Sequence, residues 1–239
     1  MEKLKKILFL FLKKISRIIY WIIPIELKPN LDLTDKIADY TKNKSFEVFK
    51  EDLKKSVLFN DYEKIRKYSI ETALQNDQNL EKNYLEFGVF TGTSANFFSK
   101  FVKKLYVFDS FEGLKDDWGG VINHPKGYYD LKKKLPKLNA NVEPVVGWVE
   151  DTLEEFLKKN NKEINFVHID LDTYESTLFV LKKIKPLLSK NAIIIFDELY
   201  NYFGFEYGEY KALKEAFDDN EYIYKAFMIN GPKVVVQIK

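Results

Sequence analysis

Four acidic side chains follow two apolar runs of the sequence. Asp170 and Asp172 end the run Ile164–Asp172, and Asp197 and Glu198 come at the end of the next one. Residues two apart in a strand face the same side, so we expect Asp170 and Asp172 to point the same way. Unpaired carboxylates gathered at one rim repel one another, and a bound cation would remove that cost. The alternative is that they cap helices or form salt bridges, although no Lys or Arg lies close by in the sequence.

The available ligands restrict any metal to a hard cation. The 239 residues contain no cysteine and only two histidines, His124 and His168. Disulfides, iron–sulfur clusters, thiolate nucleophiles and three-histidine metal sites are therefore excluded. A site made mainly of oxygen atoms favours Mg²⁺ or a similar ion. By strand alternation His168 shares the face of Asp170, so it orients a ligand, acts as a base, or is a structural histidine.

A glycine turn follows the first apolar run and is a candidate cofactor site. Gly88 and Gly92 allow a tight turn, and Ser94 then begins a helix. The turn lacks G-x-G-x-x-G, which weakens the case for a pyrophosphate, and Glu86 before it suits a cationic ligand such as a sulfonium. A purely structural turn is the alternative. Asp109 lies about 20 residues further on, where nucleotide-binding sheets place an acid on the ribose hydroxyls.

Aromatic residues flank these candidates. Trp148 ends the third apolar run, either as the flat wall of an adenine pocket or as a core residue. Residues 116–129 form a loop rich in Gly, Trp and Tyr, which we interpret as a substrate-facing lid. The aromatic side chains expected to stack on sugar faces are Trp118, Tyr128, Tyr200, Tyr202, Phe203 and Tyr207.

Seven short apolar runs supply the elements that must position these residues. Five of them alternate with long, partly helical connections, which is the pattern of parallel strands covered by helices on both faces. The last two are separated only by residues 230–233, so they form an antiparallel hairpin. The predicted fold is an α/β, Rossmann-like sheet of seven mostly parallel strands with that C-terminal hairpin, as in class I methyltransferases. The runs are Tyr84–Phe90, Leu105–Ser110, Val142–Trp148, Ile164–Asp172, Ala192–Leu199, Tyr222–Ile229 and Val234–Ile238.

The charge is balanced overall but unevenly placed. There are 38 Lys and Arg residues against 36 Asp and Glu residues, a net charge of +2, which argues against a general nucleic-acid binder. Residues 1–28 hold seven basic and two acidic residues. Their apolar residues recur at helical spacing, opposite the basic ones. Pro24 and Pro29 are expected to end this segment.

This basic segment has two interpretations. Its apolar runs are far shorter than the roughly 20 residues of a membrane span, and no signal-peptide cleavage site follows them. One interpretation is an amphipathic helix on an anionic membrane surface, with Tyr20 and Trp21 at the headgroups. The other is a helix packed on the protein body or on a second subunit. We divide the chain into this N-terminal helix (residues 1–30), a helical cap or dimerisation segment (residues 31–80) and a catalytic domain (residues 81–239).

Five strings resemble the macrocin O-methyltransferase family: LEFGVFTGTSANFFSK, FDSFEGLKDDWGG, GWVEDTLEEFL, FVHIDLDTYEST and IIIFDELYNYFG. The resemblance implies a class I enzyme that methylates sugar hydroxyls with S-adenosylmethionine and Mg²⁺. Asp170, Asp197 and Glu198 would be the metal ligands and Asp172 the base, with His168 as a further catalytic candidate. The family often has Asp where this chain has Glu198, so that ligand departs from the pattern. The implied cofactor contacts are Glu86, Gly88, Thr91, Gly92, Ser94, Asp109, Ser110, Trp148, Asp151 and Asp170.

The sequence thus predicts an O-methyltransferase that acts on the sugar of a glycoside or a surface polysaccharide precursor. We expect a cytoplasmic homodimer with a small-molecule or glycan acceptor and no nucleic-acid partner, and contact with the inner membrane surface if residues 1–28 bind lipid. A Rossmann-type oxidoreductase is one alternative, against which the missing G-x-G-x-x-G and the terminal hairpin count. A non-catalytic, membrane-recruited scaffold is another, against which the intact acids count.

Overall fold

A computed structural model describes residues 2–22 and 33–239. The chain divides into two compact units, residues 1–40 and 41–239. The first unit contains helix α1 (Glu2–Ile22) and the start of helix α2 (Leu33–Leu53). None of the described helices is long and apolar enough to cross a membrane. Pro24 and Pro29, predicted to end the basic segment, lie outside the described residues.

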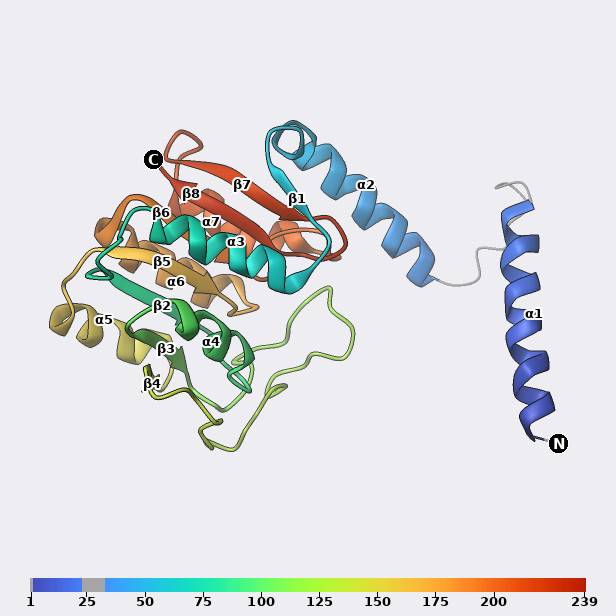
Figure 1. The fold of residues 1–239 in the computed structure, drawn as a ribbon, viewed down its shortest axis with the longest axis horizontal. Coiled ribbons are helices and arrows are strands. Elements are labelled where there is room, and N and C mark those ends of the chain that lie inside the picture. The colour runs from blue at the N-terminus through green and yellow to red at the C-terminus, as the bar shows by residue number, and fades with distance from the viewer. Residues whose placement is uncertain (1, 23–32) are drawn as a thin grey trace. The chain divides into compact units, whose positions relative to one another are not determined.

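The second unit is built around one twisted sheet of eight strands in the order β1-β7-β8-β6-β5-β2-β3-β4 (Figure 1). Strand β8 runs antiparallel to both β6 and β7, and every other pair is parallel. The predicted crossover-linked strands and the terminal hairpin are therefore confirmed. The strands are β1 (Val57–Phe59), β2 (Asn83–Phe87), β3 (Leu105–Asp109), β4 (Val142–Val146), β5 (Ile164–Ile169), β6 (Leu188–Phe196), β7 (Tyr222–Met228) and β8 (Val234–Ile238).

The prediction of seven strands was wrong by one. Strand β1 lies in the segment that was predicted to be helical, and it extends the sheet by pairing parallel to β7, with Val57 opposite Ala226. The backbone N–H of Ile229 also donates to the carbonyl oxygen of Phe59 at 2.8 Å. Three residues are too few for an alternating pattern to emerge, so only the pairing with a distant strand defines this element.

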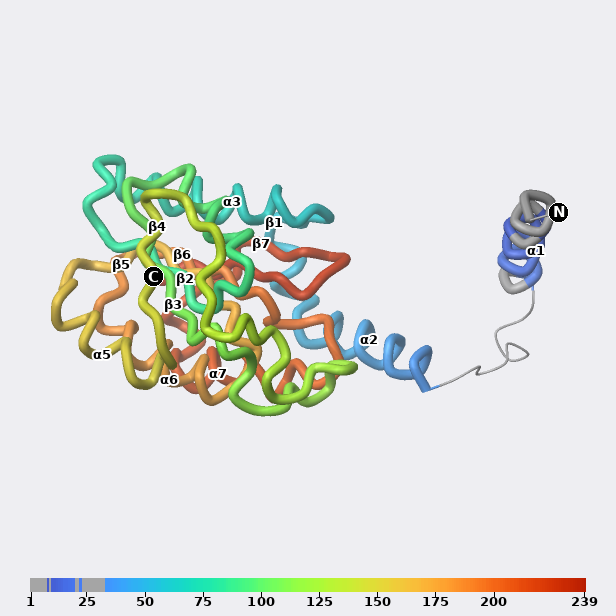
Figure 2. The backbone as a smooth tube through the Cα atoms, turned by 90° about the horizontal axis from the view of Figure 1, so that it is seen from below, coloured from blue at the N-terminus to red at the C-terminus, as the bar shows by residue number. Residues whose placement is uncertain are grey.

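Helices cover both faces of the sheet (Figures 1 and 2). One face carries α3 and α4, and the opposite face carries α5, α6 and α7. Each face has its own apolar core, because successive strand side chains alternate. In β2, for example, Leu85 and Phe87 belong to the α5–α7 core and Tyr84 belongs to the other. The helices are α3 (Tyr62–Leu74), α4 (Thr93–Phe98), α5 (Val149–Lys159), α6 (Tyr174–Ile184) and α7 (Glu209–Ala216), with 3₁₀ turns at Ser99–Phe101, Lys185–Leu187 and Phe205–Tyr207.

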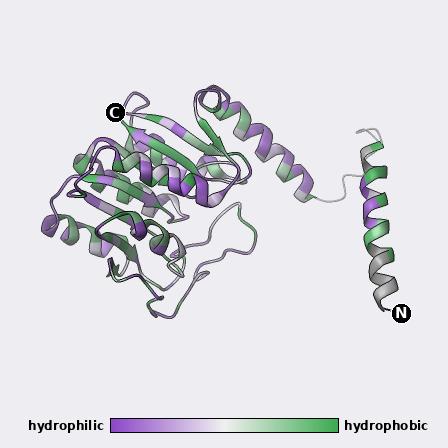
Figure 3. Cartoon of the chain, in the orientation of Figure 1, coloured by the Kyte–Doolittle hydropathy of each residue, from purple (hydrophilic) through white to green (hydrophobic). Residues whose placement is uncertain are grey.

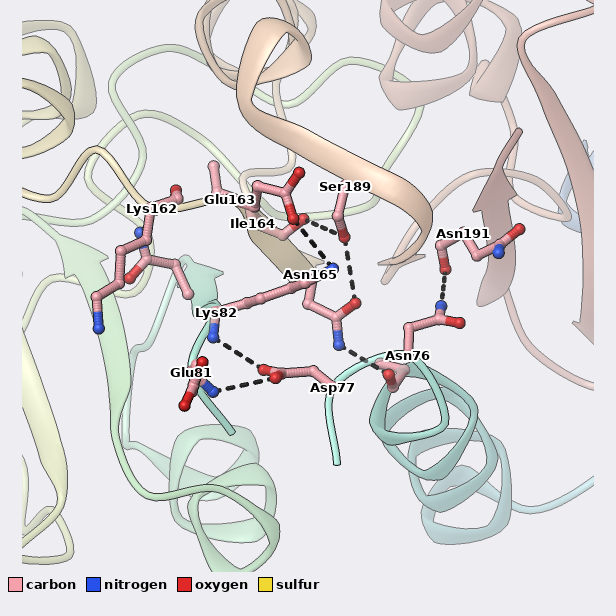
Figure 4. A network of polar contacts seen from close by, with 12 residues as sticks. Asn76, Asp77, Glu81, Lys82, Lys162, Glu163, Ile164, Asn165, Ser189 and Asn191 are labelled. Atoms are coloured by element: carbon pink, nitrogen blue, oxygen red, sulfur yellow. Dashed lines mark hydrogen bonds and ion pairs between the residues drawn. The ribbon is translucent and has the colours of Figure 1, made fainter. Parts of the chain in front are cut away.

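The hydropathy of the chain follows this layering, with hydrophobic residues concentrated in the strands (Figure 3). A buried polar network fastens the C-terminal end of α3 to the amino ends of the central strands (Figure 4). The Asn165 side chain donates to the carbonyl oxygen of Ala73 at 2.7 Å, and the Asn76 side chain donates to that of Asn191 at 2.7 Å. These hydrogen bonds hold α3 against the amino ends of the strands. Ligands of open α/β sheets bind at the opposite, carboxyl ends.

Candidate functional site

A cavity of about 250 Å³ opens at the carboxyl ends of β2 to β6. The glycine turn after β2, the end of β3, the start of α5 and the residues after β5 and β6 form its wall. Eight of the predicted site residues line it: Gly88, Asp109, Ser110, Trp148, Asp170, Asp172, Asp197 and Glu198. Six others lie outside the lining: Glu86, Thr91, Gly92, Ser94, Asp151 and His168. The structure thus gathers residues that lie up to 110 positions apart, from 88 to 198, around one space.

Three carboxylates come together at one side of this cavity. Asp170, Asp172 and Glu198 each offer an oxygen atom, and these atoms lie within 4.8 Å of one another. The expected reason for this convergence was wrong, because β5 ends at Ile169. The backbone N–H of Asp170 still donates to the carbonyl oxygen of Phe87 at 2.8 Å. The chain then turns at Asp172, whose backbone is in the left-handed region with φ +61°. A turn, and not strand alternation, therefore brings Asp172 beside Asp170.

Asp197 differs from these three carboxylates because it has cationic partners. Its Oδ2 is paired with the ammonium of Lys233, and its Oδ1 lies 3.7 Å from Arg66 Nη2 and 3.1 Å from His168 Nε2. No local sequence pattern marks Arg66 and Lys233 as partners of Asp197, since Arg66 lies on α3 and Lys233 directly before β8. Asp197 is therefore a neutralised carboxylate that lines the same cavity, and one of its oxygen atoms lies within 4.8 Å of Asp170.

The pKa values of Asp170, Asp172 and Glu198 are shifted in the opposite direction from that of Asp197. Burial and the charge of Asp197 raise the pKa of Asp170 to about 7. Burial and the charges of neighbouring carboxylates likewise raise the pKa values of Asp172 and Glu198 well above the usual range. Burial alone would raise the pKa of Asp197 too, but the His168 hydrogen bond and the charge of Lys233 hold it well below its usual range. A cation bound beside Asp170, Asp172 and Glu198 would therefore favour their ionised forms, whereas Asp197 is kept ionised by its protein partners.

His168 lies beneath this site and is fully buried. Its Nδ1 lies 3.1 Å from Glu86 Oε1 and its Nε2 lies 3.1 Å from Asp197 Oδ1. Burial lowers the pKa of His168, but the hydrogen bonds to Asp197 and Glu86 outweigh that effect and raise the pKa to about 9. The imidazolium therefore has both N–H groups engaged, which fits the structural interpretation and leaves no free nitrogen to act as a base.

Glu209 is a member of the site that the sequence analysis missed. It is the first residue of α7, is fully buried, and accepts the backbone N–H of Glu198 on Oε2 at 3.0 Å. Among the described residues, Glu209 Oε1 and Glu198 Oε2 are buried oxygen atoms without a hydrogen-bond partner. Buried carboxylate oxygens without partners are costly, so they indicate a place for a cation.

The glycine turn is held in shape by its neighbours. Gly88 has φ +86°, and a Cβ there would lie 1.7 Å from the carbonyl oxygen of Asp170, so only glycine fits. Asp109 Oδ2 accepts the backbone N–H groups of Val89 and Phe90 at 2.8 and 2.9 Å. Ser94 donates its hydroxyl to the buried Glu86. Asp109 thus both lines the cavity and fixes the turn.

Of the remaining candidates, Trp148 and Ser110 line the cavity, whereas Asp151 and Thr91 do not. Trp148 is half-buried at the N-terminus of α5, with Lys115 Nζ 5.8 Å from its ring centre. Ser110 is buried and accepts the N–H of Glu112 at 3.1 Å, whereas Asp151 is exposed on α5. Thr91 is exposed on the turn and contacts the Thr93 hydroxyl at 3.2 Å.

One tyrosine of the predicted lid loop lines the cavity. Tyr129 packs edge-on against Phe90, with ring centres 5.0 Å apart. Burial and the charges of Asp172, Glu198 and Asp170 raise its pKa, so its hydroxyl stays protonated beside the carboxylates. The six aromatic residues proposed to stack on a sugar lie outside the lining.

Comparison with known proteins agrees with this geometry. Residues 85–199 match the family described as Methyltransferase domain. The calicheamicin methyltransferase CalS11 is similar in structure at a TM-score of 0.59 and 19% identity, covering 88% of this chain and 93% of that one. The O-methyltransferase NovP is similar at a TM-score of 0.56 and 19% identity, and the match covers 74% of this chain and 79% of that one. An apo structure of CalS11, named there TDP-rhamnose 3'-O-methyltransferase, has a TM-score of 0.53 at 20% identity and covers 88% and 95%.

No curated protein sequence matches the chain significantly. The strand order and the terminal hairpin are nevertheless consistent with the matched family, since all three indicate a methyltransferase-type sheet. The chain therefore has a Rossmann-like methyltransferase fold, and residues 85–199 within it match the family described as Methyltransferase domain.

Proposed function

We propose that this chain is an S-adenosylmethionine- and Mg²⁺-dependent O-methyltransferase that methylates a sugar hydroxyl of a glycoside or a surface polysaccharide precursor. The observation that carries the proposal is the convergence of oxygen atoms from Asp170, Asp172 and Glu198 within 4.8 Å, at the side of the cavity that the Gly88 turn also lines. The sugar acceptor is suggested by the macrocin-type strings and by the printed name of CalS11, a TDP-rhamnose 3'-O-methyltransferase.

The charge of the site fits a divalent cation. With every carboxylate ionised, the cluster around the cavity carries an excess of three negative charges, six acids against three cations. A divalent ion together with a cationic methyl donor would offset that excess. The acids are Glu86, Asp170, Asp172, Asp197, Glu198 and Glu209, and the cations are Arg66, His168 and Lys233.

Asp170 and Glu198 would hold the ion, because both offer hard oxygen atoms close together and Glu198 Oε2 has no hydrogen-bond partner among the described residues. Asp197, a ligand in the set implied by the resemblance, would contribute only by sharing an oxygen that Lys233 or His168 already contacts. When bound, Mg²⁺ would stabilise the negative charge that develops on the acceptor oxygen.

The protein groups would perform the remaining steps. Asp172 lies within 4.8 Å of both proposed ligands, and its raised pKa makes it a stronger proton acceptor. It would take the proton of the acceptor hydroxyl as that oxygen forms a bond to the methyl carbon and the carbon–sulfur bond breaks. The Gly88 turn and Asp109 would hold the donor in line with this oxygen, while Tyr129 would exclude water.

Ligand binding by the purified chain tests this function against its alternatives. We expect S-adenosylhomocysteine to raise the melting temperature and NAD to leave it unchanged. The opposite result would favour an oxidoreductase. Isothermal titration with no heat of binding for S-adenosylhomocysteine would favour a non-catalytic scaffold. Release of S-adenosylhomocysteine with a panel of glycosides and nucleotide sugars, with and without EDTA, then tests the metal requirement.

A further inference from the structure

Helix α1 exposes an unusual amount of apolar surface. Seven large apolar side chains along its 21 residues each have between 51% and 75% of their surface accessible. They are Leu8, Leu10, Phe11, Leu12, Ile18, Ile19 and Ile22. Single exposed apolar residues are common on proteins, but a concentration of this kind on one helix marks an interaction surface.

The apolar and basic residues of α1 occupy different sides of the helix. Leu8, Phe11, Ile18 and Ile22 are separated by steps that bring them onto one face. Among the residues whose side chains are described, Lys13 and Arg17 fall on the opposite side, Lys14 borders the apolar face, and Leu10 lies among the bases. Figure 3 shows hydrophobic and hydrophilic positions alternating along the described part of α1.

The charge of the helix decides which partner fits this face. Residues 2–22 contain six basic residues and a single acid, Glu2. Two copies packed through their apolar faces would leave Lys13 and Arg17 on their outer sides with no acid to pair with, and only Lys14, at the border of the face, would approach its counterpart. Such pairing would use none of the positive charge of the helix. An anionic surface would instead attract all of these cations while it takes up the apolar face.

The length of α1 is compatible with lying on such a surface. A helix of 21 residues extends about 30 Å, but the bases that interrupt its apolar residues prevent it from spanning a bilayer. We propose that α1 lies in the plane of a bilayer that contains anionic phospholipid. The side chains of Leu8, Phe11, Ile18 and Ile22 would enter the acyl boundary, and Lys14 at the border of that face would contact lipid phosphates. Lys13 and Arg17 would add electrostatic attraction to the anionic surface.

Flotation of the 239-residue chain with lipid vesicles tests this proposal. The vesicles are pure phosphatidylcholine, or phosphatidylcholine mixed with phosphatidylglycerol. We expect binding to the mixed vesicles only, weakened by high salt. The triple variant Lys13→Glu, Lys14→Glu and Arg17→Glu should bind at least about tenfold more weakly. Phe11→Ser with Ile18→Ser should also lower the bound fraction, since the apolar face is lost.

A charge-matched variant controls for the net charge of the protein. It reverses Lys158, Lys162 and Lys190, which are exposed on the second unit, and should bind vesicles as well as the original chain. Melting curves with S-adenosylhomocysteine verify that the second unit is intact in every variant. Equal binding to neutral and anionic vesicles, or unchanged binding by the α1 variants, would overturn the proposal. So would light scattering that shows a dimer dissociated by Phe11→Ser with Ile18→Ser, since the apolar face would then serve a second copy.

Discussion

The Glu209 carboxylate accepts the backbone N–H of Glu198 at 3.0 Å and thereby fixes the chain where a proposed metal ligand leaves the sheet. Its second oxygen is buried without a hydrogen-bond partner among the described residues. Mutation of a group that orients a metal ligand typically lowers metal affinity by about 10- to 100-fold. Glu209 is therefore a positioning residue for Glu198.

Replacing Glu209 should weaken Mg²⁺ binding. We expect Glu209→Ala to raise the dissociation constant about tenfold or more, measured by isothermal titration, because Glu198 loses its anchor. Glu209→Gln keeps an oxygen that accepts this N–H and should restore much of the affinity. Glu215→Ala, an exposed acid on the same helix, is the matched control. A loss of S-adenosylhomocysteine binding equal to that of Mg²⁺ would indicate a general structural role instead.

The two aspartates after β5 should differ in their effects on turnover. We expect Asp170→Asn to abolish Mg²⁺-dependent release of S-adenosylhomocysteine, because a proposed ligand is lost. Asp172→Asn should keep cofactor binding but lower kcat at least about a hundredfold, since a general base is removed. Full activity of both variants in the presence of EDTA would contradict the mechanism.

The pair formed by Lys233 and Asp197 should matter for stability. The Lys233 side chain is only 3% exposed, so removing its charge leaves Asp197 buried with fewer partners. We expect Lys233→Met to lower the free energy of unfolding by about 3 kcal/mol, measured with urea. Lys185→Met breaks the more exposed pair with Glu221 and should cost less than about 1 kcal/mol. Adding Asp197→Asn to Lys233→Met should recover part of the loss, and no recovery would argue against a charge effect.

Gly88 should tolerate no side chain. Gly88→Ala places a methyl group against the Asp170 carbonyl oxygen at a position with φ +86°. We expect a loss of more than about 2 kcal/mol in the free energy of unfolding, together with weaker S-adenosylhomocysteine binding. Gly119→Ala, where nothing lies within 4 Å of the new Cβ, is the control. Equal melting temperatures for the two variants would show that the turn can relax.

Asp77 should make stability depend on pH in the acid range. The Asp77 carboxylate accepts the backbone N–H groups of Glu81 and Lys82 (Figure 4). It also accepts the Tyr84 hydroxyl. Burial raises the pKa of Asp77, but these hydrogen bonds outweigh it and lower the pKa below 3.8. The depressed pKa means that the carboxylate stabilises the fold above pH 3.8 and loses this effect as the pH falls further.

The variant Asp77→Asn isolates this contribution. We expect it to be about 1–2 kcal/mol less stable than the original chain at pH 7, with the difference shrinking below the usual aspartate range. Urea unfolding of both proteins, at pH 7 and at a pH below the usual aspartate range, measures the difference in free energy of unfolding under each condition. A difference of the same size at both would show that shape, and not charge, accounts for the effect.

The sequence was sufficient for the crossover-linked strands, the terminal hairpin and the acids at the cavity, but not for β1. Apolar runs, their spacing and a four-residue connection depend only on neighbouring residues, so the parallel strands and the β7–β8 hairpin were predicted correctly. Asp170, Asp172, Asp197 and Glu198 were identified because they follow apolar runs, and carboxyl ends of neighbouring strands meet at one edge.

The tertiary structure decided what surrounds those acids. Arg66, Lys233 and Glu209 reach the cluster from α3, β8 and α7, and no local pattern marks such distant partners. These contacts separate the neutralised Asp197 from the three carboxylates without cationic partners. Strand β1 likewise exists only through its pairing with β7. Short-range periodicity specifies elements, whereas charge pairing and burial depend on residues that approach one another only after the sheet has formed.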